Sequence, residues 1–182
     1  MRRQFYAVLV LVLALLATAG PASANALFPD FPLSAQLTTE QQAYLGVTGP
    51  TLRLSEVQAP LLLIEVFSMY CPYCQRDAPE VNEFHKRLRL QGLDSKLKIL
   101  GIGAGNTPFE VDFFKDKFAV PFPLFADEDY AVHTALGNVG TPYFVLVRVT
   151  GPDKLEILLT QEGSPENMQA FFTDVLKKAG LE

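Results

Sequence analysis

The sequence is poor in the residues that hold metals or bind polyanions. It has two cysteines, two histidines and no tryptophan, and its 15 basic residues are outnumbered by 20 acidic ones. A formal net charge of −5 argues against nucleic acid as a partner, because surfaces that bind it carry an excess of Lys and Arg. The sequence also lacks internal repeats, linkers and low-complexity segments. It is therefore the sequence of an ordinary globular protein that carries one pair of thiols.

The first 24 residues predict a secretory signal peptide. Arg2 and Arg3 form a positive start, residues 5–19 are apolar, and residues 22–24 read Ala-Ser-Ala, a small-residue cleavage pattern. We expect cleavage near Ala24, a periplasmic or otherwise extracytoplasmic location, and a mature net charge of about −7. The alternative is an apolar segment that is retained as a membrane anchor. No cysteine lies at the cleavage site, so a lipid anchor is not indicated.

The remaining chain is long enough for one domain that buries a core without disulfide staples. We divide it into an N-terminal extension, residues 25–50, and a main domain, residues 51–182. The extension begins with an extended, proline-containing lead-in, followed by a short capped helix at Thr38–Leu45 that Gly46 ends. The sequence does not show whether this extension shapes the functional site.

Within the main domain, strands alternate with helices and a hairpin follows. Strands are predicted at Thr51–Leu54, Leu61–Phe67, Lys96–Gly103 and Pro121–Phe125, and helices at Cys74–Gln91, Thr107–Phe118 and Asp129–Leu136. Alternation of this kind implies parallel strands. Strands at Tyr143–Val149 and Leu155–Thr160 then form an antiparallel hairpin, and a last helix starts at Ser164. The expected fold class is α/β, a central mixed sheet flanked by helices.

The two cysteines directly follow the buried strand at Leu61–Phe67. They form the sequence Cys71-Pro72-Tyr73-Cys74, at the start of a helix. Unpaired helix amides and the helix dipole favour an anion there, so the pKa of Cys71 should be lowered. Cys74 lies one turn on, where it can attack a mixed disulfide formed at Cys71. Because so short a loop constrains the unfolded chain little, we interpret the pair as a redox-active disulfide.

With this order of elements the sequence resembles the thioredoxin superfamily, from Thr51 to about Leu181. The signal peptide and the inserted strand-helix unit are similar to the TlpA/ResA-type thiol-disulfide oxidoreductases, relatives of the AhpC/TSA peroxiredoxins. The resemblance implies that Cys71 is the nucleophile and Cys74 the resolving thiol. It also implies that Pro79 is the proline of the active-site helix that kinks it.

Two further catalytic residues follow from the resemblance, Glu65 and Pro142. Glu65 matches the buried acid that exchanges a proton with the resolving cysteine, and burial in a strand covered by helices should raise its pKa. Its alternative is an outward-facing carboxylate at a strand edge. Pro142 matches the cis-proline that packs against the disulfide, and its alternative is an ordinary trans turn.

Four residues that flank the pair are expected to bind substrate: Tyr70, Pro72, Tyr73 and Thr141. Since a proline cannot donate to a sheet, a substrate strand can pair with the exposed backbone beside Pro142. Cys-Pro-Tyr-Cys is also the form typical of glutaredoxins, but the sequence has no glycine pair after Pro142 of the kind that glutathione binders use.

The resemblance implies an enzyme, an extracytoplasmic thiol-disulfide oxidoreductase that exchanges with protein thiols or disulfides. Apocytochrome c is one substrate class compatible with it. Pro72 and Tyr73 add no positive charge beside Cys71, so we predict a reductant that a membrane electron donor keeps reduced. We expect a monomer with no cofactor and no bound metal.

Two other functions stay open from the sequence. A peroxidase would place a Thr three residues before its cysteine and a Pro four before that, where this chain has Ser68 and Ile64. A metal carrier would need both thiolates and either His85 or His133, neither of which has ligand spacing to the pair. We expect His85 to be a solvated surface residue. Asp77 either influences the thiols, as in ResA-like proteins, or complements the helix dipole.

Overall fold

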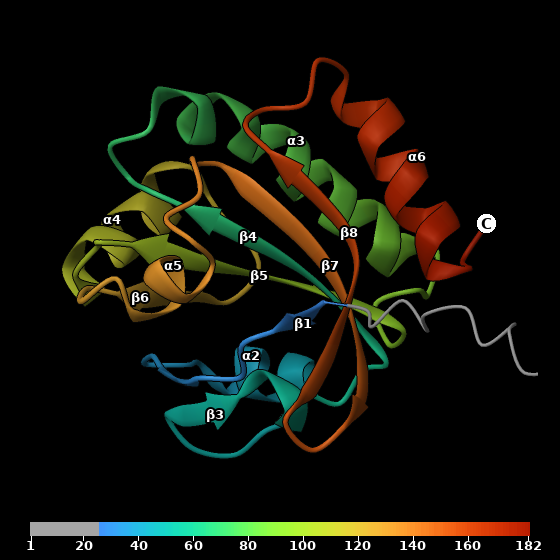
Figure 1. Cartoon of the computed structure of the whole chain (residues 1–182), viewed down its shortest axis with the longest axis horizontal. Helices are drawn as coiled ribbons and strands as arrows, with labels where there is room; N and C mark the ends of the chain where they lie inside the picture. Colours follow the sequence, from blue (N-terminus) through green and yellow to red (C-terminus); the bar gives the residue numbers. More distant parts are fainter. Residues whose placement is uncertain (1–25) are drawn as a thin grey trace, which may run out of the picture.

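The computed structural model describes residues 26–182, and the predicted signal segment lies outside the described residues. A six-stranded sheet forms the centre, in the order β1-β8-β7-β4-β5-β6 (Figure 1). Its strands are β1 (Leu27–Phe28), β4 (Leu61–Phe67), β5 (Leu97–Ala104), β6 (Leu124–Asp127), β7 (Tyr143–Gly151) and β8 (Lys154–Glu162). β4, β5 and β6 are parallel, whereas β7 is antiparallel to both β4 and β8. The predicted mixed sheet is therefore confirmed.

Helices cover both faces of this sheet. They are α2 (Thr39–Leu45), α3 (Pro72–Leu90), α4 (Pro108–Lys117), α5 (Ala131–Ala135) and α6 (Met168–Ala179), with a 3-10 turn η1 at Leu54–Glu56. α3 and α6 lie together on one face, and α2 lies on the other, next to β3 (Thr51–Arg53), as Figure 1 shows. β3 pairs with β2 (Pro32–Ser34) in a separate two-stranded sheet.

Strand β4 is buried along its whole length. Its alternate side chains belong to two hydrophobic cores, one on each face of the sheet. Leu63 and Phe67 pack with residues of α3, α4 and α6, whereas Leu62 and Ile64 pack with the N-terminal segment on the other face. Successive side chains of a strand point to opposite faces. Glu65 shares the parity of Leu63 and Phe67, so its carboxyl lies on the α3 side.

The N-terminal segment is more ordered than an extended lead-in. β1 pairs with β8, and the N–H of Ile157 donates to the carbonyl of Ala26 over 2.9 Å. Phe28, Leu33 and Leu45 are buried in the second core. The apolar residues between the prolines thus cover a sheet face that would otherwise be exposed.

Three of the boundaries that differ from the expected ones have clear local reasons. α3 begins at Pro72, because proline suits the first helical position and Cys71 acts as the N-cap. β6 begins at Leu124, since Pro121 and Pro123 cannot donate to a sheet. α6 begins at Met168, because Asn167 caps it by accepting from the Ala170 N–H over 2.9 Å. Within residues 26–182, no helix has both the length and the hydropathy to cross a bilayer.

Candidate active site

Cys71 lies at the N-terminus of α3, directly after the loop that leaves β4. Its Sγ accepts a hydrogen bond from the Cys74 N–H over 3.4 Å. The thiol also donates to the carbonyl oxygen of Thr141 over 3.1 Å. The sulfur is half-buried. It is therefore reachable by a substrate and held between α3 and the loop before β7.

Opposing effects set the pKa of Cys71. Burial of the sulfur is the largest single influence and raises it, but hydrogen bonds from the Cys74 N–H, the Thr141 side chain and the Tyr73 N–H outweigh burial. The net result is a pKa below the ordinary value of a thiol. This agrees with the expected thiolate at the start of the helix.

Cys74 is fully buried, in the core between the sheet and α3. Burial and then the negative charge of Glu65 raise the pKa of its thiol far above the ordinary value. The structure shows both cysteines as free thiols. The two thus differ as a nucleophile and a resolving cysteine should, one accessible and acidic, the other shielded and protonated.

Glu65 is buried on β4, with only 4 % of its surface exposed. Burial raises the pKa of its carboxyl to about 8, and the charges of Asp77 and then Cys71 push it in the same direction. Its Oε1 has no hydrogen-bond partner among the described residues. The expected burial is confirmed, and the outward-facing alternative is excluded. The carboxyl is mostly protonated at neutral pH and can exchange a proton.

Asp77 is also buried, at 4 % exposure, and not a solvated residue of the first helical turn. Its Oδ1 accepts from the Nε of Arg76 over 3.0 Å, while its Oδ2 is buried without a partner among the described residues. Because its charge helps to raise the pKa of Glu65, Asp77 is electrostatically coupled to the active site. Interaction with the helix dipole alone therefore does not explain the position of Asp77.

The peptide bond between Thr141 and Pro142 is cis, as the resemblance implies. The carbonyl of Pro142 accepts from the Gly163 N–H over 2.8 Å, which ties this loop to the end of β8. Of the four expected substrate-binding residues, Tyr70 is 66 % and Tyr73 56 % exposed. Pro72 is also exposed and Thr141 half-buried. Thr141 contacts the Cys71 sulfur, the other three lie within two positions of Cys71 in the chain, and the contact of all four with substrate stays a prediction.

The sequence analysis missed two side chains that hold the loop before Cys71. The N–H of Met69 donates to Oδ1 of Asn106 over 2.8 Å, and the carbonyl of Met69 accepts from Nε2 of Gln75 over 2.7 Å. Asn106 is completely buried. It follows β5, and adjacent parallel strands end at the same sheet edge, a signal that could have pointed to it.

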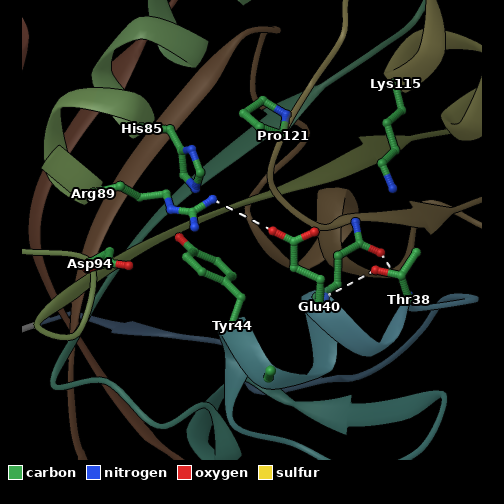
Figure 2. Close-up of a pocket in the computed structure, with 10 residues that line it drawn as sticks. Thr38, Glu40, Tyr44, His85, Arg89, Asp94, Lys115 and Pro121 are labelled. Carbon is green, nitrogen blue, oxygen red and sulfur yellow. Dashed lines mark hydrogen bonds and ion pairs between the residues drawn. The ribbon is translucent and has the colours of Figure 1, made fainter.

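His85 is the one clear error among the predicted surface residues. It is 3 % exposed and lies against Tyr44, with 5.5 Å between ring centroids, because α2 packs over this part of α3. Burial and then the positive charge of Arg89 lower its pKa to about 4. It borders a cavity of about 530 Å³ near the C-terminal end of α3 (Figure 2). This cavity is remote from Cys71, at the opposite end of the helix.

No three His, Cys, Asp or Glu side chains within residues 26–182 are grouped to hold a metal ion. His133 instead contacts the carbonyl of Val139 through its Nε2, over 2.8 Å. Ser68, at the threonine position of peroxidases, accepts from the Tyr70 N–H over 3.4 Å.

Sequence comparison finds relatives with named activities. The chain is 25 % identical, over 130 residues, to the thiol-disulfide oxidoreductase ResA of Halalkalibacterium halodurans, which covers 71 % of this chain and 69 % of the relative. It is 25 % identical to the ResA of Geobacillus thermodenitrificans over 144 residues, 78 % of this chain and 74 % of the relative.

Solved structures share the fold. A putative thiol:disulfide interchange protein DsbE from Chlorobium tepidum superposes with a TM-score of 0.67 at 16 % identity, covering 86 % of this chain and 97 % of that one. A putative protein disulfide isomerase from Bacteroides thetaiotaomicron gives a TM-score of 0.66 at 18 % identity, covering 87 % and 90 %. The model of the AhpC/TSA family matches residues 25–163. The chain therefore belongs to the AhpC/TSA family, as a thioredoxin-fold protein of the TlpA/ResA-like type.

Proposed function

We propose that the protein is an extracytoplasmic thiol-disulfide oxidoreductase that reduces disulfides in protein substrates. One observation carries this proposal: an accessible low-pKa thiol, Cys71, is paired with the shielded thiol of Cys74, whose pKa is raised by the charge of the buried Glu65 carboxyl. The names of the ResA relatives support the same reaction class.

The reaction proceeds in two exchanges. The Cys71 thiolate attacks one sulfur of a substrate disulfide, which forms a mixed disulfide and releases the other substrate sulfur as a thiolate. Cys74 then loses its proton and attacks the Cys71 sulfur, which releases the second substrate thiolate. The protein ends with a Cys71–Cys74 disulfide and the substrate as a dithiol, so two electrons have moved to the substrate.

Glu65 is the proposed proton acceptor for the second exchange. Cys74 cannot ionise readily by itself, because burial raises the pKa of its thiol. The Glu65 carboxylate, formed as the pH approaches its pKa of about 8, takes this proton without contact with bulk water. Pro142 and Thr141 are proposed to position the substrate, since the Thr141 carbonyl lies 3.1 Å from the reacting sulfur.

The direction of electron transfer, from the protein to the substrate, follows from how weakly the Cys71 thiolate is stabilised. Its stabilising contacts are hydrogen bonds, and the nearby cation Arg76 is already paired with Asp77 over 3.0 Å. A less stabilised thiolate favours the disulfide form, which makes the protein a reductant. We propose that a membrane-bound dithiol donor restores the reduced form, and that misoxidised protein thiols and apocytochrome c are the candidate substrates of a monomeric enzyme.

The extracytoplasmic location rests on residues 1–24, whose pattern is that of a secretory signal peptide. A peroxidase is less favoured, because the Ser68 hydroxyl accepts from Tyr70 and Ile64 replaces the proline of that pattern.

Trapping tests the function directly. Cys74→Ser keeps the nucleophile but removes the resolving thiol, so mixed disulfides with substrates should accumulate and disappear on treatment with dithiothreitol. Cys71→Ser is the matched control and should capture nothing. Equal capture by both variants, or by neither, contradicts the proposal.

A further inference from the structure

A groove opens beside Cys71, between α3 and the loop that connects β8 to α6. Its volume is about 600 Å³, and Tyr73, Arg76, Glu80, Thr141 and Glu166 are among its lining residues. Thr141 contacts the Cys71 thiol through its carbonyl, and Tyr73 belongs to the turn between the cysteines. A substrate whose sulfur meets Cys71 can therefore extend its chain into this groove.

The positive charge in the groove is already engaged. The Nε of Arg76 lies 3.0 Å from Oδ1 of Asp77, and its Nη2 donates to Oγ of Ser164 over 2.5 Å. The guanidinium also stacks over the Tyr73 ring, 4.9 Å from its centroid. Because Asp77 is buried beneath the groove surface, its carboxylate offsets the positive charge of Arg76 from the protein interior. Arg76 thus links α3 to the connecting loop.

Two carboxylates in the groove are not engaged in this way. Glu80 projects from α3 and Glu166 from the connecting loop, and both are exposed. Neither makes an ion pair or a hydrogen bond with any residue between 26 and 182. Glu162, nearby at the end of β8, accepts from the Gly140 N–H over 2.7 Å and adds a third negative charge. The groove therefore carries more negative than positive charge.

We propose that this groove selects substrate segments that carry a lysine or arginine close to the reacting cysteine, through Glu80 and Glu166. The inference rests on the proposed function and names the substrate class of the same site. A basic side chain of the substrate would be attracted by both carboxylates without displacing an existing partner. An acidic side chain would be repelled by them.

The expected preference for basic substrates is modest, because the charges involved are exposed. A single exposed ion pair contributes little and is screened by salt, and charges at the rim of an interface act mainly on the rate of encounter. Two carboxylates together should give about a tenfold preference in kcat/KM at low salt. The preference should shrink to about twofold near 0.5 M salt.

The test compares two peptides that each contain one internal disulfide and differ only in a lysine or a glutamate next to the first cysteine. The full-length reduced protein is mixed with each peptide, and the second-order rate of reduction is measured. Each rate is divided by the rate with uncharged hydroxyethyl disulfide, which reports the reactivity of Cys71 itself. The variant is the double substitution Glu80→Gln with Glu166→Gln, and the control is Asp174→Asn with Glu182→Gln, which changes the net charge equally.

We expect the wild type and the control to reduce the lysine peptide about tenfold faster than the glutamate peptide, and the groove variant to lose most of this difference. A wild-type ratio below twofold at low salt overturns this inference alone, as does a groove variant that keeps the wild-type ratio. If neither the peptides nor hydroxyethyl disulfide is reduced, the proposed function fails and the inference fails with it.

Discussion

The backbone N–H of Cys74 donates to the sulfur of Cys71 over 3.4 Å. The residue proposed to resolve the mixed disulfide thus also helps to stabilise the proposed nucleophile before reaction. Once Cys71 is bonded to a substrate it carries no negative charge, and this hydrogen bond loses most of its strength. The contact therefore favours the free thiolate over the mixed disulfide.

Alkylation should separate the two thiols. With limiting iodoacetamide between pH 5 and 9, we expect label at Cys71 first, with a midpoint below the ~8.5 of an ordinary thiol, because hydrogen bonds lower its pKa. Cys71→Ser should abolish the fast reaction. Preferential labelling of Cys74, which is fully buried, would contradict the assignment.

Glu65→Gln should slow the second exchange by about tenfold to a hundredfold at neutral pH, because it removes the proposed proton acceptor. In the wild type this rate should rise with pH, reach half of its maximum near pH 8, the pKa of Glu65, and level off above it. Release of the second thionitrobenzoate from a chromogenic aromatic disulfide, followed by stopped flow, measures it. Asp174→Asn serves as a surface control, and a Gln variant with the wild-type pH profile would assign Glu65 a structural role only.

The same substitution should change how stability depends on pH. Burial raises the pKa of Glu65 from 4.5 in the unfolded chain to about 8 in the fold. Between these values the unfolded chain is ionised while the folded protein keeps the proton, so the wild type loses stability as the pH rises from about 4.5 to about 8. Glu65→Gln lacks this loss. We expect it to gain on the order of 5 kcal/mol relative to wild type between pH 4.5 and 8.5, measured by urea unfolding.

Asn106→Ala should weaken both the fold and the active-site loop. It leaves the partly buried N–H of Met69 without its acceptor at a completely buried Asn106, a loss of about 2 kcal/mol. Gln75→Ala removes the donor to the carbonyl of the same residue, Met69, but Gln75 is half-buried, so the loss should stay below about 1 kcal/mol. Chemical unfolding gives both values, and the alkylation rate of Cys71 shows whether the loop has moved. Equal losses would contradict the special role of Asn106.

The redox potential decides the direction of the reaction. We expect a value more negative than the ~−120 mV of the strongly oxidising DsbA, because among residues 26–182 no cation contributes to the lowered pKa of Cys71 and Arg76 is paired with Asp77. Equilibration against glutathione buffers, read out by thiol alkylation, provides it. A potential close to that of DsbA would reverse the proposed direction and leave the thiol-disulfide exchange itself intact.

Much of the site could be predicted because short stretches of sequence determine its structure. The apolar run of β4 and the period of two along a strand place Glu65 inside, and Pro72 after Cys71 marks the start of a helix. The cis bond before Pro142 came from the resemblance, since an X-Pro pair alone favours trans.

The remaining features depend on contacts between distant parts of the chain. His85 has an ordinary helical position, and only the packing of Tyr44 from α2 buries it. Asn106 is 37 positions from Met69, and no local pattern indicates that its side chain holds that peptide. Arg76 likewise meets Ser164 across 88 positions. Such pairings arise from the tertiary fold and have no period in the sequence.

Strand β1 protects a sheet edge. It pairs with β8 through Leu27 and Phe28, and the carbonyl of Ala26 accepts from Ile157. Unpaired edge strands promote association between molecules. A recombinant form trimmed to begin at Phe31 would uncover part of the β8 edge and the apolar surface beneath Phe28, which invites dimers and precipitation. Expression vectors for this protein should therefore keep Ala26 and place any affinity tag before it or after Glu182.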